Sequence, residues 1–285
     1  MTRFVLGRIG FYTLIAVLLA FFTIPLLWLV TAPFTSDPTY EIKIPGFTSD
    51  PTSEGKVPGF TLDNFRAVAE HPYALPSLYN SLVLSVGTAV LVVILASLAA
   101  YALSRVRLPG RDALLYALLL LSSIITGTAA MVPLFQLAVE LNLIDSQLGL
   151  ILILTGGLLP AAIFMLKDFM DSTPKSYEES ARVFGATPLQ IVRHVVVPLV
   201  RPGLATVGVW AVANVWGNFL MPYLLLSDVE KQPAAVITYT LYTEGGQANL
   251  SMLSTFGLLY SVPVVLMYLF VSKKYGFRFH GGIKR

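Results

Sequence analysis

Three polar or aromatic residues recur along one apolar stretch of the chain. Trp210, Asn214 and Asn218 are spaced i, i+4 and i+8, which places them close to one face of a helix. Amide groups hydrogen-bond hydroxyls and an indole ring offers a flat stacking surface, so this face would suit a neutral polyhydroxylated solute. Asparagine can equally hold neighbouring helices together, and tryptophan can anchor a helix at a membrane surface. The pattern therefore predicts either a solute pathway or a helix-packing seam.

Residue types that usually carry catalysis are absent or scattered. The sequence has no cysteine, and its three histidines, His71, His194 and His280, are isolated and form no metal-ligand cluster. No Ser/His/Asp set can be assigned, and no G-x-x-x-x-G-K-S/T phosphate loop occurs. We therefore expect a non-catalytic chain that holds no metal or cofactor and does not itself bind or hydrolyse ATP. An integral membrane enzyme is the least supported hypothesis.

Capping signals predict a pair of short helices between the fourth and fifth apolar runs of the chain. Thr173 is a good N-cap with Pro174 at the first helical position, where a missing N–H costs nothing. Gly185 suits the left-handed C′ position that ends a helix. Thr187 and Gln190 then form a capping box that starts the second helix. The segment is expected to be a compact helix-turn-helix.

The first helix of this pair has an aromatic and alanine face. Tyr177, Ala181 and Phe184 lie on it at i, i+4 and i+7. Such a face suits insertion into a groove of a partner protein. Connections in compact structures usually have about 4–6 residues, so the length of this connection indicates that it has a function. A well-folded loop without a partner is the alternative.

The spacing of this element resembles the EAA motif of ABC importer permeases, which reads E-A-A, x3, G, x9, I-x-L-P. Glu179-Ser180-Ala181 is followed at the same spacing by Gly185 and by V-V-V-P over residues 195–198. The departures are conservative except for Phe184, which stands where sugar permeases often have Asp. The resemblance implies a coupling helix that docks in a cleft of a nucleotide-binding subunit. The candidate contacts are Glu178, Glu179, Ser180, Ala181 and Gly185.

Nearly the whole chain resembles the carbohydrate-uptake, MalG-like branch of these permeases, through residues 61–65, 80–82, 99–105, 132–135, 216–222 and 281–284. The resemblance implies a type I ABC importer transmembrane fold that imports a sugar or sugar-like solute by alternating access. It also implies a second permease subunit, two ATP-binding subunits that use ATP and Mg, and an extracytoplasmic solute-binding protein. A non-sugar solute such as a glycerol-phosphate or polyol is an alternative.

Composition places the chain in a membrane. Hydrophobic residues make up 55% and charged residues 12%, whereas soluble domains carry about 25% charged residues. The net charge of +3 comes from residues between apolar runs and forms no basic patch, so nucleic acid binding is excluded. Membrane lipid is the expected surrounding.

Stretches free of charged residues predict an all-α membrane protein with six transmembrane helices, each able to cross a hydrocarbon core about 30 Å thick. The first run is too long for a signal peptide and is expected to remain as an anchor. Gly156, Gly157 and Pro160 could kink the fourth span or allow close packing. The predicted spans are 9–36, 78–104, 113–139, 146–166, 202–227 and 248–272.

Charge asymmetry orients these spans. Fifteen of the nineteen Lys and Arg residues fall on one side, so the positive-inside rule predicts an inner-membrane protein with both termini in the cytoplasm. The cytoplasmic segments are then 1–8, the coupling loop 167–201 and the tail 273–285. The extracytoplasmic loop 37–77 contains a near-duplication, 44–50 and 57–63, which is either a partner surface or a tolerated insertion.

The predicted spans contain no Asp, Glu, Lys, Arg or His. Ion-coupled carriers commonly use such groups within the membrane, so their absence weakens that hypothesis. Sodium coupling through carbonyls and hydroxyls stays open, and an ion-coupled secondary carrier is the alternative to an ATP-driven importer.

Overall fold

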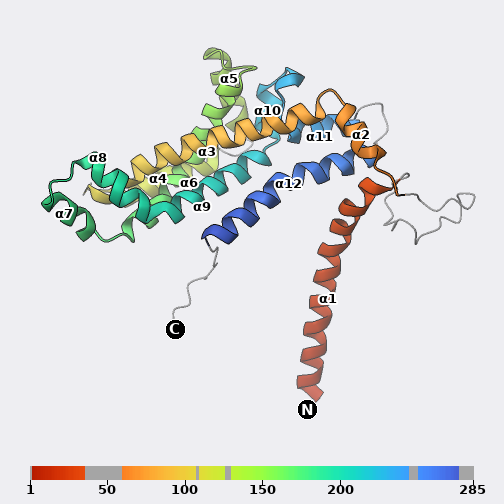
Figure 1. Ribbon diagram of the computed structural model, residues 1–285, viewed down its shortest axis with the longest axis horizontal. Coiled ribbons are helices and arrows are strands. Elements are labelled where there is room, and N and C mark those ends of the chain that lie inside the picture. The colour runs from red at the N-terminus through yellow and green to blue at the C-terminus, as the bar shows by residue number, and fades with distance from the viewer. Residues whose placement is uncertain (1, 36–59, 107–108, 126–129, 244–249, 276–285) are drawn as a thin grey trace, which may run out of the picture. The chain divides into compact units, whose positions relative to one another are not determined.

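The structure is a computed structural model that describes residues 2–35, 60–106, 109–125, 130–243 and 250–275 (Figure 1). Within these residues every element is helical, and one isolated β-bridge joins Thr35 to Phe60. The chain forms two compact units. The smaller comprises Met1–Pro76 with Ile237–Pro263, and the larger comprises Ser77–Val236 with Val264–Arg285. The expected all-α architecture is confirmed in the described part of the chain.

The smaller unit begins with the long, exposed helix α1 (Thr2–Thr31), followed by the short turn η1 (Ala32–Phe34) and helix α2 (Asp63–Glu70). Asn64 ties α2 to this turn, since its amide nitrogen donates to Pro33 O and Thr35 O. The first copy of the near-duplication, 44–50, lies outside the described residues, and so do residues 57–59 of the second copy.

The larger unit holds the elements that carry the candidate sites. Helices α11 and α12 are shared between the two units. The elements are α3 (Ala74–Arg105), α4 (Arg111–Ile125), α5 (Met131–Glu140), α6 (Gln147–Asp171), α7 (Ser176–Val183), α8 (Pro188–Ile191), a π-helical segment (Val192–Val196), α9 (Val197–Trp216), α10 (Leu220–Leu225), a 3-10 turn (Val229–Lys231), α11 (Ala234–Thr243) and α12 (Leu250–Tyr275).

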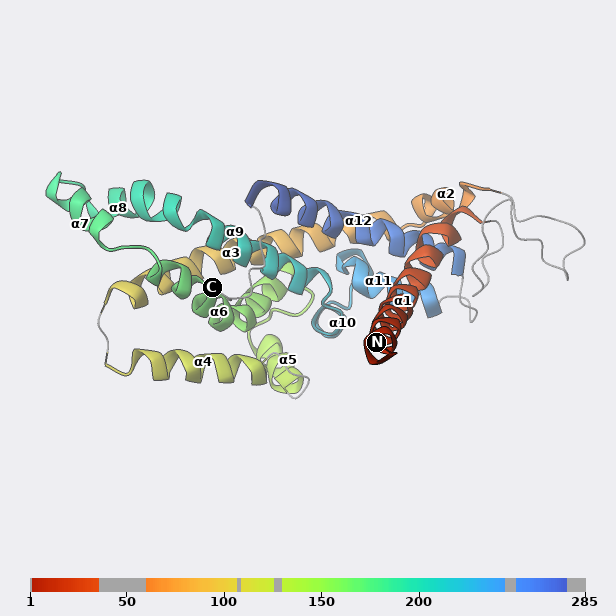
Figure 2. The same ribbon diagram turned by 90° about the horizontal axis from the view of Figure 1, so that it is seen from below.

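Five helical stretches among the described residues are long and apolar enough to cross a membrane. The predicted run 113–139 differs, because it is divided between α4 and α5 and its centre, 126–129, lies outside the described residues. Figure 2 shows α4 alongside α6, on which it packs. The five stretches are Gly10–Phe34, Ala74–Arg105, Gln147–Asp171, Pro188–Trp216 and Leu250–Lys273.

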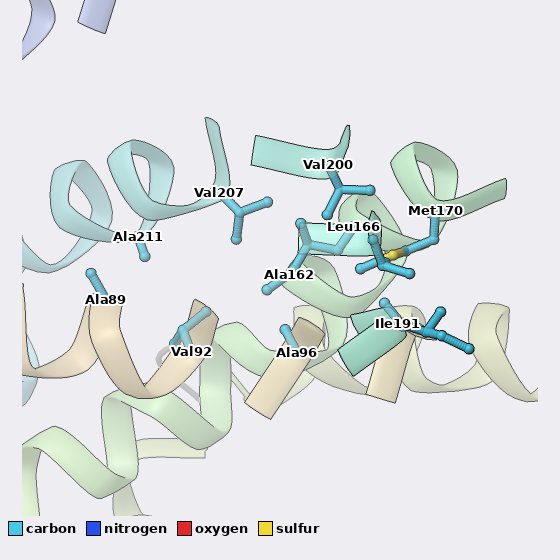
Figure 3. Packing of buried hydrophobic residues seen from close by; sticks show 12 residues of the cluster. Ala89, Val92, Ala96, Ala162, Leu166, Met170, Ile191, Val200, Val207 and Ala211 are labelled. Atoms are coloured by element: carbon cyan, nitrogen blue, oxygen red, sulfur yellow. The ribbon is translucent and has the colours of Figure 1, made fainter. Parts of the chain in front are cut away.

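Small side chains let α3, α6 and α9 pack closely in the larger unit. Figure 3 shows Ala89, Val92 and Ala96 of α3 near Ala162 of α6 and Ala211 of α9. Small residues at helix contacts allow backbones to approach, which is the main source of packing energy where lipid replaces water. The cluster continues through Leu166 and Met170 of α6, Ile191 of α8, Val196, and Val200 and Val207 of α9.

A π-helical segment joins α8 to α9. Over Val192–Val196 the helix widens, and the N–H of Val197 donates to the carbonyl of Val192, five residues back. Pro198 follows at once, and a proline inside a helix removes one backbone hydrogen bond and clashes with the carbonyl four residues before it. The wider turn accommodates this proline, so Pro188–Trp216 runs as one continuous stretch.

Candidate functional site

Helices α7 and α8 form the end of the larger unit (Figure 1). Helix α7 begins at Ser176, so the prediction that Thr173 caps it is wrong. The Thr173 hydroxyl donates instead to Phe169 O at 3.1 Å, within the last turn of α6. The carbonyl of Lys175 accepts the N–H groups of Glu178 and Glu179 at the start of α7. These two carboxylates lie in the first turn, where a helix favours negative charge.

The predicted turn and second cap are both confirmed. Gly185 has φ +81°, a left-handed conformation that side chains with a Cβ rarely adopt, and its N–H donates to Arg182 O. In the capping box the N–H of Thr187 donates to Gln190 Oε1 at 2.8 Å. The N–H of Gln190 donates to Thr187 Oγ1 at 3.4 Å. Both ends of the turn are therefore fixed by local hydrogen bonds.

Glu178 faces into the protein. Its side chain is 4% exposed, and its Oε1 accepts from Arg105 Nε at 2.6 Å. The Tyr101 hydroxyl donates to its Oε2 at 3.1 Å. Both carboxylate oxygens are thus used by α3, so the structure places this candidate contact residue in an internal ion pair rather than on the outer surface.

The other candidate contact residues lie differently. Glu179, Ser180 and Gly185 are exposed, whereas Ala181 is half-buried and packs against the cluster drawn in Figure 3. The predicted face of Tyr177, Ala181 and Phe184 is therefore not a single exposed surface. Its alanine stabilises the helix pair from within.

Three apolar residues next to the turn of the helix pair, Val183, Phe184 and Leu189, are strongly exposed, and we call them the apolar tip. These residues are 85%, 90% and 76% exposed respectively. Sequence reasoning missed Val183 and Leu189, although each is an apolar residue next to the turn of an otherwise polar helix pair. Exposed apolar residues that are close together are a feature of interaction surfaces.

A cavity of about 210 Å³ lies deeper in the larger unit, between α5, α6, α9 and α10. Asn214, on α9, and Asn218, two residues after the end of α9, both line it. Trp210 packs beside the buried cluster instead. The Asn214 amide nitrogen donates to Trp210 O at 2.8 Å, and Asn218 Oδ1 accepts from Met221 N at 3.2 Å. The remaining lining residues are Leu134, Ile153, Leu154, Gly157, Leu158, Val215 and Met221.

The cavity combines an apolar wall with two amides. Gly157 belongs to the wall contributed by α6. Among the described residues, no group of three or more His, Cys, Asp or Glu could hold a metal ion. The arrangement offers hydrogen bonds and apolar contact to a solute, and no charge.

Comparison with known proteins agrees with the expected resemblance. The family described as "Binding-protein-dependent transport system inner membrane component" matches residues 3–274. The inner membrane ABC transporter permease protein YcjP of Escherichia coli (strain K12) is 35% identical over 192 residues, covering 66% of this chain and 67% of that protein. The maltodextrin transport system permease protein MdxG of Bacillus subtilis (strain 168) is 29% identical over 214 residues, covering 75% and 77%.

The fold is similar to that of a chain in the crystal structure of a bacterial ABC transporter involved in the import of the acidic polysaccharide alginate. The TM-score is 0.77 at 20% identity, and the match covers 96% of this chain and 98% of that chain. The family match extends over both compact units and includes the capped helix pair and the cavity. The chain therefore belongs to the family of inner-membrane components of binding-protein-dependent transport systems.

Proposed function

We propose that the chain is a permease subunit of an ATP-driven importer that moves a sugar or oligosaccharide inward by alternating access. One observation carries this proposal: the capped helix pair with EAA spacing ends in the apolar tip of Val183, Phe184 and Leu189. Helices presenting apolar anchors commonly dock in grooves of partner proteins. The name of the relative MdxG, a maltodextrin permease, supports the solute class.

The tip serves as the docking surface for an ATP-binding subunit. Glu179, Ser180 and Gly185 flank it and are exposed, so they can contact the same partner. Ala181 and Glu178 support the helix from its inner side. ATP and Mg belong to two such partner subunits, and a second permease chain and an extracytoplasmic solute-binding protein complete the transporter.

The orientation of the chain in the membrane follows from the position of the apolar tip. An ATP-binding subunit works in the cytoplasm, so α7 and α8 lie on that side of the inner membrane. The excess of Lys and Arg on this side agrees with that placement and puts both termini in the cytoplasm.

The cavity between α5, α6, α9 and α10 is the proposed solute-contact region of this subunit. Asn214 and Asn218 supply amide donors and acceptors, and the leucine and methionine side chains supply apolar contact. A site of this composition suits a neutral polyhydroxylated solute better than an ion, because it offers no charged group.

The proposal is tested by purifying the tagged chain from its native membrane and identifying the ATP-binding subunits that accompany it. We expect Phe184→Asp to abolish this association, because it places a charge at the centre of the apolar tip. The matched control is Leu141→Asp, at an exposed leucine between α5 and α6, which should leave the association unchanged.

Uptake into vesicles of labelled maltodextrins and smaller sugars then tests the transport class. The expected uptake requires ATP and survives ionophores that collapse ion gradients. Uptake that needs an ion gradient and persists in Phe184→Asp would instead establish an ion-coupled carrier.

A further inference from the structure

The cytoplasmic end of α3 is joined to α7 through an ion pair between Arg105 and Glu178. Arg105 is the last residue of α3, and its side chain is 11% exposed. Its Nε donates to Glu178 on α7, and its terminal nitrogens donate to Met170 O on α6 at 3.3 Å and to Thr173 O at 3.5 Å. A single guanidinium therefore links α3, the end of α6 and the coupling helix.

The ion pair between Arg105 and Glu178 is a strong electrostatic contact. Both partners are nearly buried, and hydrogen bonds between ionised groups are roughly twice as strong as neutral ones. The guanidinium carbon also lies 5.9 Å from the centre of the Tyr101 ring, whose hydroxyl donates to the same carboxylate. In the described part of the chain, the hydrogen bonds between side chains of α3 and α7 both end on Glu178.

A second polar layer ties the neighbouring helix ends together. The Ser104 hydroxyl donates to Asp171 Oδ1 at 2.5 Å, and Lys167 Nζ lies 2.7 Å from Asp171 Oδ2. Arg105 in turn donates to Ser104 Oγ at 3.0 Å. The ends of α3 and α6 are thus fixed to each other beneath the coupling helix, so a displacement of Glu178 is shared by both.

The two adjacent glutamates of α7 lie in different surroundings. Glu178 is buried and Glu179 is exposed, since neighbouring residues on a helix point about 100° apart. The chain continues from α7 forward to α9, through α8 and the π-helical segment, and backward to α6, through residues 172–175, but it makes no direct covalent connection to α3. The ion pair gives α7 a separate connection to α3, and through Arg105 an additional one to α6.

We propose that Arg105 is a positioning residue for energy coupling, which passes the movement of α7 to α3 and α6 through Glu178. This inference rests on the proposed function, because it assumes that an ATP-binding subunit moves α7. In this proposal the Arg105–Glu178 pair transmits movement from the docking surface to α3 and α6, and it does not itself bind the ATP-binding subunit.

The test uses the complete transporter in lipid vesicles and measures solute transported per ATP hydrolysed. Arg105→Gln and Glu178→Gln remove one charge each; Glu178→Gln keeps the side-chain length, whereas Arg105→Gln also shortens the side chain. We expect both variants to retain their ATP-binding subunits while transport per ATP falls about tenfold, within the range of roughly 5- to 150-fold typical of coupling between sites. Arg105→Lys, which keeps the charge, should restore most of the ratio.

Arg66→Gln is the matched control. Arg66 forms an ion pair with Glu70 of the same geometry, 2.8 Å from Nε to Oε1, but the two side chains are 80% and 66% exposed. Exposed pairs contribute little, so transport per ATP should stay at the wild-type value. Solute transport and ATP hydrolysis both come from the assembled transporter. A variant that only lowers the amount of folded protein therefore reduces both and does not change transport per ATP.

Two results would overturn the inference. In one, the wild-type transporter is coupled and Phe184→Asp dissociates it, yet Arg105→Gln and Glu178→Gln keep the wild-type ratio. In the other, the two variants lose their ATP-binding subunits as Phe184→Asp does, which assigns the pair to docking. Absence of any ATP-binding subunit from the wild-type preparation contradicts the proposed function instead.

Discussion

The contact between α6 and α9 predicts a large effect from adding one methyl group. A Cβ at Gly203 on α9 would lie 2.5 Å from Cγ, 2.7 Å from Cδ2 and 2.9 Å from Cβ of Phe169 on α6. These atoms are at the root of the phenylalanine side chain, so rotation about χ1 cannot move its Cβ away. Gly203→Ala therefore forces α6 and α9 apart.

The size of the effect follows from two opposing contributions. Overpacking a well-packed contact costs about 1–3 kcal/mol. Replacing glycine by alanine inside a helix returns about 0.5–1 kcal/mol. We expect a net destabilisation of about 0–2.5 kcal/mol, together with loosening of Val200 and Met170 in the adjoining cluster.

Gly208→Ala provides a control on the same helix. A Cβ there meets Val93 Cγ2 at 3.6 Å, an ordinary contact, so this variant should be as stable as the wild type or more stable. The helix-propensity gain is common to both variants, and the difference between them isolates the packing cost.

The assay is thermal unfolding of the purified protein in one detergent, followed by intrinsic fluorescence. Gly203→Ala should unfold at a lower temperature than the wild type and Gly208→Ala. Adding Phe169→Ala to Gly203→Ala should cost less than Phe169→Ala costs alone, because the clash has gone. Equal unfolding temperatures for the two glycine variants would refute the close approach of α6 and α9.

Three further predictions concern the candidate sites. Phe184→Ala should weaken binding of the ATP-binding subunit about 10- to 150-fold, as expected for losing about 1.5–3 kcal/mol of aromatic burial. Phe184→Leu should retain most of it in the same binding titration. Asn218→Leu should raise the KM for solute uptake about 2- to 13-fold through loss of one hydrogen bond, whereas an unchanged KM would remove this amide from the pathway. Thr187→Ala should destabilise the helix pair by about 0.5–2 kcal/mol, seen as faster amide exchange in α8, and Thr187→Ser should not.

Local signals in the sequence were sufficient for the turn between α7 and α8. Gly185 and the Thr187–Gln190 box need only residues within one helical turn, so the sequence predicts them without knowledge of the fold. The start of α7 was less predictable, because Thr173 can bond either forward to a new helix or back to Phe169, and the end of α6 decides between them.

The long apolar runs predicted helices well but not their interruptions. The run 113–139 shows no charge that would divide it, yet it forms two helices, α4 and α5. The predicted span 202–227 is broken after Trp216, where Gly217, Asn218 and Phe219 separate α9 from α10. Hydropathy reports which residues avoid water and carries little information about where a backbone breaks inside an apolar environment.

Burial of single polar residues depends on distant parts of the chain. Sequence spacing placed Trp210, Asn214 and Asn218 close to one face, but the packing of α9 brings only the two asparagines to the cavity. The two glutamates of the coupling helix show the same dependence. Glu178 and Glu179 have the same charge and the same length. Glu178 is the buried one because it pairs with Arg105, which lies on α3.

This dependence explains why the motif spacing alone gave an incomplete account of the coupling element. A motif defines the residues that a helix presents, whereas the helices beneath it determine which of them can reach a partner. An exposed glutamate and a buried glutamate are both needed if the element is to bind on one side and transmit movement on the other. The apolar tip of the helix pair is exposed and the Arg105–Glu178 pair is nearly buried, so in the proposed mechanism force applied at the first reaches α3 and α6 through the second.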